Sequence, residues 1–162
     1  MISTPLSFKQ VGIALLLLFI SVYLLPLNLR QLSIPDEMRY GEIAREMLAT
    51  GDFITPRLND LRYFEKPAGG HVLNAVSLAV FGETNFGVRF MSALATGLGA
   101  LALVLLVKKE TDARTAMLAG FMVLTCVMVM GIGTFSLLDA MVTGFITLTL
   151  CCFYPALTAT GK

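Results

Sequence analysis

The sequence predicts an all-α integral membrane protein with about four transmembrane helices. The chain has 162 residues, of which 56% are hydrophobic and only 14% are charged, and its mean hydropathy is +0.79. A soluble core of this size cannot bury so large an apolar share, so part of the surface must face lipid. The charge is also uneven, because 13 of the 23 charged residues fall between Arg30 and Lys66. The net charge of +1 excludes the basic footprint of a nucleic-acid-binding protein.

Four apolar segments approach the length of about 20 residues that a helix needs to cross a bilayer. They lie at residues 11–29, 86–107, 115–135 and 140–157. Lys9 precedes the first segment and no small-residue cleavage site follows it, so we expect an uncleaved helix whose amino end is cytoplasmic.

A fifth segment, 68–82, is short for a span and contains the polar residues His71, Asn74 and Ser77. If it crosses the membrane, the basic loop 108–114 lies outside; if it lies along the membrane or re-enters, that loop lies inside with Lys9 and Lys162. The positive-inside rule favours the second arrangement and hence four spans. Asp139 then shares the outer face with the loop 30–85, whereas five spans place the two on opposite faces.

The long outer loop, about 30–85, begins with a predicted interfacial helix over 36–49. Pro35 precedes this helix, acids occupy its first turn and Gly51 follows it. Apolar residues recur at helical spacing on one side, which is typical of a helix lying on the bilayer. Three charged residues on the other side are read as its solvated face: Glu42, Arg45 and Glu46.

Two charged groups in this loop are candidates for chemistry. Asp36 and Arg39 lie near the exit from the first span, where a carboxylate can accept a proton and an arginine can bind a phosphate. In "LRYFEKP", an extended backbone before proline puts Tyr63 and Glu65 on one side and Lys66 on the other. An acid–lysine pair there suits anion or metal binding, and an ordinary loop ion pair is the alternative.

Asp139, in "FSLLDAM", is a further candidate. It is the only acid after Asp112, and an ionisable group at a span boundary is a functional hypothesis. The alternative is a helix N-cap in a short hairpin.

At these residues the sequence resembles a known family. "PDEMRYGEIAREMLATGDFITPRLNDLRYFEKP", "FGETNFGVRFMSAL" and "GIGTFSLLDAM" are similar, in this order, to the bacterial aminoarabinose transferases that modify lipid A. These belong to the GT-C-fold glycosyltransferases, which also include the protein mannosyltransferases.

The resemblance implies a GT-C-type N-terminal module with a periplasmic first loop, in a multi-pass protein of the bacterial inner membrane. It implies transfer of 4-amino-4-deoxy-L-arabinose from undecaprenyl phosphate to a lipid A phosphate, which protects against polymyxin and other cationic peptides. Lipid A and membrane lipid are thus expected partners, and no nucleic acid is. No nucleotide-binding fingerprint is present, and the lipid-linked donor needs none.

The resemblance also assigns roles. Asp36 and Asp139 are implied catalytic acids, and a divalent metal, Zn or Mg, is implied at Glu65. The implied contacts to the donor phosphate are Arg39, Tyr63 and Lys66. Glu37 and Tyr40 share the first motif without a defined role. His71 stands where an aromatic residue is expected in relatives, so it is read as a polar interfacial residue rather than a metal ligand.

Length is the main departure from the family, whose members carry more spans and a soluble periplasmic domain. The 162 residues are therefore expected to be part of the transferase: a fragment, one piece of a split enzyme or a truncated product. The alternatives are another polyprenyl-phosphate-sugar transferase, such as a protein mannosyltransferase, a small four-span membrane subunit, or an inactive remnant.

Overall fold

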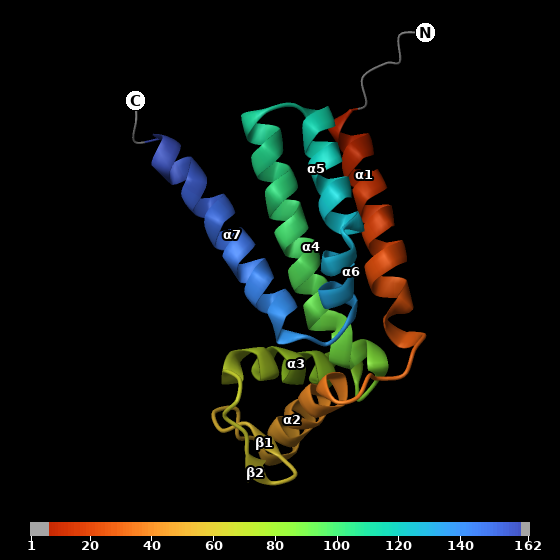
Figure 1. Cartoon of the computed structure of the whole chain (residues 1–162), viewed down its shortest axis with the longest axis vertical. Helices are drawn as coiled ribbons and strands as arrows, with labels where there is room; N and C mark the ends of the chain where they lie inside the picture. Colours follow the sequence, from red (N-terminus) through yellow and green to blue (C-terminus); the bar gives the residue numbers. More distant parts are fainter. Residues whose placement is uncertain (1–6, 160–162) are drawn as a thin grey trace.

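The structure, a computed structural model, describes residues 7–159 as helices with one short hairpin (Figure 1). The elements in order are α1 (Phe8–Phe19), η1 (Ile20–Leu24), η2 (Leu25–Asn28), α2 (Asp36–Thr50), β1 (Arg57–Leu58), β2 (Leu61–Arg62), α3 (Ala68–Phe81), α4 (Asn85–Glu110), α5 (Ala113–Thr125), α6 (Val127–Thr134) and α7 (Leu138–Ala159).

The long apolar helices form a bundle, and α2, α3 and the hairpin lie together at one end of it (Figure 1). Within residues 7–159, three helical stretches are long and apolar enough to cross a membrane: Phe8–Asn28, Asn85–Glu110 and Leu138–Thr158. The bent pair α5–α6 makes a fourth if it is counted as one span. The prediction of an all-α membrane protein with about four spans is therefore confirmed, and the chain is a multi-pass membrane protein.

The third span differs from the single helix predicted over 115–135. It breaks at Cys126, whose backbone is extended (φ −63°, ψ 121°), and α5 and α6 are bent by 61°. The buried Tyr23 hydroxyl donates a hydrogen bond of 2.9 Å to the carbonyl of Leu124 in the last turn of α5. This bond satisfies a backbone acceptor that the broken helix leaves free.

The helix α4 lies at the centre of the bundle, and small residues bring its neighbours close. A Cβ placed on Gly144 of α7 would lie 2.8 Å from the carbonyl oxygen of Ala95. A Cβ on Gly133 of α6 would lie 2.7 Å from Oγ1 of Thr96. The backbones of α6 and α7 thus approach α4 at a distance that only glycine permits, which is a common way to pack helices in lipid.

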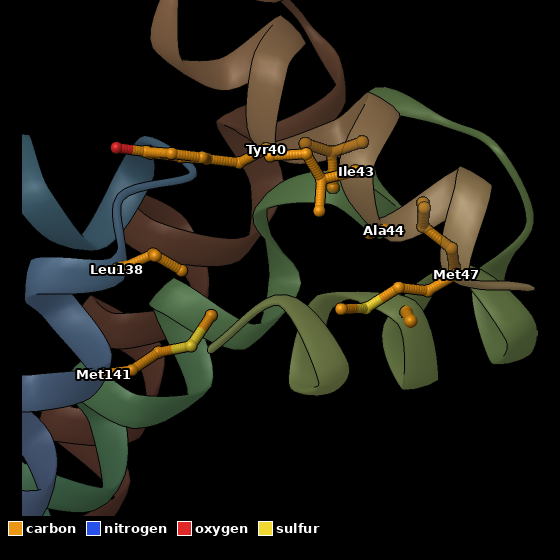
Figure 2. Packing of buried hydrophobic residues seen from close by; sticks show 9 residues of the cluster. Tyr40, Ile43, Ala44, Met47, Leu138 and Met141 are labelled. Carbon is orange, nitrogen blue, oxygen red and sulfur yellow. The ribbon is translucent and has the colours of Figure 1, made fainter. Parts of the chain in front are cut away.

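The helix α2 begins and ends close to the predicted bounds of 36–49. Gly51 ends it in the left-handed conformation (φ 71°), and its amide donates a 2.9 Å hydrogen bond to the carbonyl of Met47. Its apolar side packs into a buried cluster with α3 and α7 (Figure 2). The residues of this cluster are Tyr40, Ile43, Ala44, Met47, Ala75, Leu78, Val88, Leu138 and Met141.

The interpretation of Glu46 as part of the solvated face is wrong. Glu46 is buried and accepts hydrogen bonds from the backbone amides of Asn59 (2.5 Å) and Asp60 (3.4 Å). These residues form the β1–β2 turn, where both have positive φ (52° and 64°), as a type I′ hairpin requires. Glu42 and Arg45 do lie at the surface, paired with each other at 2.6 Å.

The helix α3 has 14 residues and is not among the helices long enough to span. It lies across the end of the bundle rather than along it (Figure 1). Leu138, at the start of α7, packs in the same cluster as α2 and α3. Asp139 therefore lies at the end of the bundle that carries the charged loop, as the four-span interpretation requires.

Candidate functional site

Arg39 is the centre of a charged cluster that joins the two predicted motifs. Its guanidinium donates to the Tyr63 hydroxyl (3.3 Å) and to Glu65 (3.2 Å), and it pairs with Asp36 at 3.4 Å. The Tyr63 hydroxyl in turn donates to Glu65 at 2.9 Å. Arg39 thus connects two predicted motifs that lie 24 or more positions apart in the sequence. Four of the predicted site residues belong to this one cluster.

This cluster is open to solvent. The side chains of Asp36 and Glu65 are 50% and 59% exposed, and that of Arg39 is 26% exposed. Exposed ion pairs contribute about 0–1 kcal/mol to stability. The cluster therefore contributes little to the stability of the fold. A charged ligand can replace one of its internal ion pairs at little energetic cost.

Lys66 is not in the predicted acid–lysine pair. Among residues 7–159, the carboxylate of Glu65 pairs with Arg39, and no ion pair involves Lys66. The half-buried Lys66 follows Glu65 directly. Lys66 is therefore a cation without a counter-ion in the described part of the chain, directly after Glu65, and is available to an anionic ligand.

Tyr40 and His71 form the buried floor of the cluster. The His71 ring lies 5.5 Å from the ring of Tyr40 and 5.9 Å from that of Tyr63, measured between centroids. Burial raises the pKa of both phenols, and burial lowers the pKa of His71. His71 is 0% exposed, so this polar residue is enclosed by protein rather than open to solvent or lipid.

Glu37 lies outside the open cluster and has a structural role. It is 1% exposed, and its two carboxylate oxygens accept hydrogen bonds from Arg89 at 2.7 and 2.9 Å. Arg30 (2.9 Å) and the amides of Ser33 (2.8 Å) and Ser136 (2.9 Å) also donate to it. Glu37 therefore joins α2 to α4, to the end of the first span and to the segment before α7.

Arg89, which sequence reasoning missed, is fully buried and uses its remaining donors on backbone carbonyls. It donates to the carbonyls of Leu27 (2.6 Å), Arg30 (2.9 Å) and Gln31 (2.8 Å), where the first span ends. These carbonyls have no helical partner, so Arg89 caps the end of one span from another. The signal was an arginine inside "FGVRFM", an apolar segment in which an ionisable residue predicts a partner.

Glu37 makes the fold sensitive to acid. Burial alone would raise its pKa, but hydrogen bonds from Arg89, Ser136 and Ser33 lower it from 4.5 to about 2. Because the folded pKa is below the unfolded one, this contribution is complete above pH 4.5 and is lost as the pH falls towards 2. We expect the free energy of unfolding to fall by about 3 kcal/mol, because each pKa unit corresponds to about 1.4 kcal/mol. The free energy of unfolding of Glu37→Gln, measured between pH 6 and 2.5, should not show this acid-induced fall. The same pH dependence in the variant as in the unaltered chain would contradict the role of Glu37.

Asp139 lies in the first turn of α7 and is exposed. It follows Leu137, whose carbonyl accepts a 3.1 Å hydrogen bond from Ser92, and Ser136, whose amide binds Glu37. No hydrogen bond or ion pair within the described part of the chain links Asp139 to the Arg39 cluster. Its position inside the helix also differs from that of an N-cap.

The described residues do not assemble a metal site. Within residues 7–159, no three His, Cys, Asp or Glu side chains come together in a way that could hold an ion. Glu65 and Asp36 are both paired with Arg39, whose positive charge opposes a cation between them. The described residues by themselves therefore do not supply the donor set of a Zn or Mg site.

These features describe a multi-pass membrane protein with a charged, partly solvated cluster at the end of its bundle. The chain matches, over residues 10–161, the family described as dolichyl-phosphate-mannose-protein mannosyltransferase. It belongs to that family.

Similar sequences agree with the resemblance found at the loop motifs. The chain is 51% identical over 142 residues to an undecaprenyl phosphate-alpha-4-amino-4-deoxy-L-arabinose arabinosyl transferase of Aeromonas salmonicida. It is 53% identical over 145 residues to the protein of the same name from Pectobacterium carotovorum. The matches cover 87% and 88% of this chain, and in each case 26% of the relative.

The fold is also similar to solved structures. ArnT from Cupriavidus metallidurans, in the apo state and bound to undecaprenyl phosphate, matches with a TM-score of 0.82 and 32% identity. The match covers 86% of this chain and 26% of that one. These matches confirm the resemblance to the aminoarabinose transferases and the GT-C type of fold. The chain thus spans about a quarter of the length of its relatives.

Proposed function

We propose that this chain provides the part of the active site that binds the donor phosphate in a glycosyltransferase. That enzyme transfers 4-amino-4-deoxy-L-arabinose from undecaprenyl phosphate to a lipid A phosphate. One observation carries the proposal: Arg39 brings Asp36, Tyr63 and Glu65 together at the end of a membrane bundle. The names of the relatives and the undecaprenyl phosphate in the ArnT structure support the choice of donor. We place this end of the bundle at the periplasmic face of the inner membrane.

The roles follow from the charges. In the proposed step, an oxygen of the acceptor phosphate attacks the anomeric carbon of the sugar. The bond from that carbon to the undecaprenyl phosphate oxygen breaks, and its electron pair leaves with the phosphate. Two anions must meet, so cations have to offset their repulsion. Arg39 and Lys66 supply the charge, and Tyr63 supplies a hydroxyl donor to the leaving phosphate.

The acids have different tasks. Asp36, paired with Arg39 at 3.4 Å and half exposed, accepts a proton from the acceptor phosphate or orients it. Asp139 is proposed as the second acid of the site. Glu37 and Tyr40 act from beneath, since both are buried. A metal at Glu65 would have to recruit further donors, and in the arrangement described Glu65 instead holds Tyr63 and Arg39.

A second candidate differs in sugar and acceptor. The family to which the chain belongs is described by mannose transfer from dolichyl phosphate to protein, so a polyprenyl-phosphate mannose donor is the competing substrate. The cluster recognises a lipid phosphate in both cases, and nothing in its contacts reads the sugar.

A chimera tests the proposal. The 142 aligned residues replace their counterparts in the Aeromonas salmonicida relative, to which they are 51% identical. Purified protein is then assayed with undecaprenyl phosphate-aminoarabinose and with a polyprenyl phosphate-mannose donor. If the site residues of this chain replace those of the parent in function, the activation barrier should stay within about 1.4 kcal/mol, and we expect aminoarabinose transfer within about tenfold of the parent. A folded chimera that binds no donor, or that transfers only mannose, would refute the proposal.

A further inference from the structure

Three buried polar atoms on α3 have no hydrogen-bond partner among residues 7–159. They are both ring nitrogens of His71 and the side-chain oxygen of Asn74. Both side chains are 0% exposed, and they lie three positions apart, on one face of the helix. A buried polar group left unpaired is energetically unfavourable. Two such residues side by side therefore indicate a shared polar ligand.

The number of donors and acceptors identifies that ligand. Burial lowers the pKa of His71, so its ring is neutral and offers one N–H and one lone pair. His71 and Asn74 therefore present two acceptors, the unprotonated ring nitrogen and the Asn74 oxygen, and one donor, the ring N–H. One water molecule has two hydrogens to donate, and buried water is typically found between such groups.

The pair sits between two hydrogen-bonded groups. On one side, His71 contacts Tyr63, whose hydroxyl binds Arg39 and Glu65. On the other side, the Asn74 amide donates to the Ser136 hydroxyl at 3.3 Å, and the Ser136 amide donates to Glu37.

We propose that His71 is a positioning residue, and that one bound water molecule shared with Asn74 links the Arg39 cluster to the Ser136–Glu37 pair. The linkage holds Tyr63, and through it Arg39, in place relative to the segment that carries Asp139. The inference deepens the proposed function, because the cluster that it positions is the proposed donor-phosphate site.

The chain has a single histidine, which makes the test direct. The intact chain, labelled with ¹⁵N-histidine and placed in nanodiscs, gives ring signals from His71 alone. At pH 7 we expect one protonated and one unprotonated nitrogen, with magnetisation transfer from water to the ring. Asn74→Leu should abolish that transfer. Ser136→Ala, which removes the Asn74–Ser136 bond and leaves the Asn74 oxygen, should keep it, as should the exposed control Val76→Ala.

Undecaprenyl phosphate is the probe for positioning, with binding followed by ³¹P NMR. It should shift the His71 signals although His71 is fully buried. His71→Phe and Asn74→Leu should each weaken binding about five- to tenfold, and the double variant should bind no worse than either, as expected for residues that act as a unit.

The outcomes separate the two claims. No water transfer in the unaltered chain, or transfer that survives Asn74→Leu, would overturn the water site. Binding of undecaprenyl phosphate that leaves the His71 signals unmoved, or additive effects of the two substitutions, would overturn the positioning role. Water transfer as expected in a chain that binds no undecaprenyl phosphate would instead refute the proposed function and leave the water-linked pair standing.

Discussion

Replacing Arg89 with leucine should lower the free energy of unfolding by about 3–5 kcal/mol, the usual effect of removing one partner of a buried ion pair. Arg89 is 0% exposed, and it donates to both oxygens of Glu37 and to three backbone carbonyls. Its removal leaves the 1% exposed carboxylate of Glu37 with Arg30 as its one cationic partner among residues 7–159. It also leaves the end of the first span uncapped. We therefore expect this to be the most destabilising single charge removal in the loop end of the bundle.

Reversible unfolding in mixed micelles measures this effect. The matched control is Arg45→Ala, which removes the exposed pair with Glu42 and should change the free energy by less than about 1 kcal/mol. The double variant Arg89→Leu with Glu37→Leu should recover part of the loss, because it leaves no unpaired buried charge. If Arg89→Leu costs no more than Arg45→Ala, the ion pair does not hold the loop to the bundle.

The main outline of the fold follows from composition and periodicity. Apolar segments of membrane-spanning length and the helix after Pro35 are local features, and the structure places α2 within a residue of its predicted bounds. The break at Cys126 was missed because the hydropathy of α5 and α6 is continuous. The carbonyl of Leu124 that the break leaves free is bound by Tyr23, a residue 101 positions earlier that lies across the bundle. No window of neighbouring residues contains that information.

The site shows the same division between local and long-range information. The motifs predicted that Tyr63 and Glu65 share a side, and they do, joined at 2.9 Å. That Arg39 rather than Lys66 would pair with Glu65 depended on how α2 packs against the chain after the hairpin. The hairpin itself had a readable signal in Asn59–Asp60, because both residue types tolerate positive φ. The burial of Glu46 had no comparable signal in the sequence, because its partners are backbone amides of that turn.

Asp36→Asn in the chimeric transferase should reduce kcat for aminoarabinose transfer by about 100-fold or more, in the range of 10²–10⁴ typical of a lost general base. The amide keeps the size of the carboxylate and removes its ability to accept a proton. The effect on folding should be small, since Asp36 is 50% exposed and its pair with Arg39 is 3.4 Å long.

The control for this substitution is Asp60→Asn, the same chemical change in the same loop. Asp60 is exposed at the hairpin turn and has a positive φ that asparagine also accepts, so kcat should stay within about twofold of the parent chimera. Binding of undecaprenyl phosphate separates the roles of the cluster. It should persist in Asp36→Asn, because Arg39 and Lys66 keep their charge, whereas Arg39→Ala should weaken it. If Asp36→Asn retains more than about a tenth of the parental kcat, the acid that accepts the proton is another residue, and Asp139→Asn is then the variant expected to show the loss.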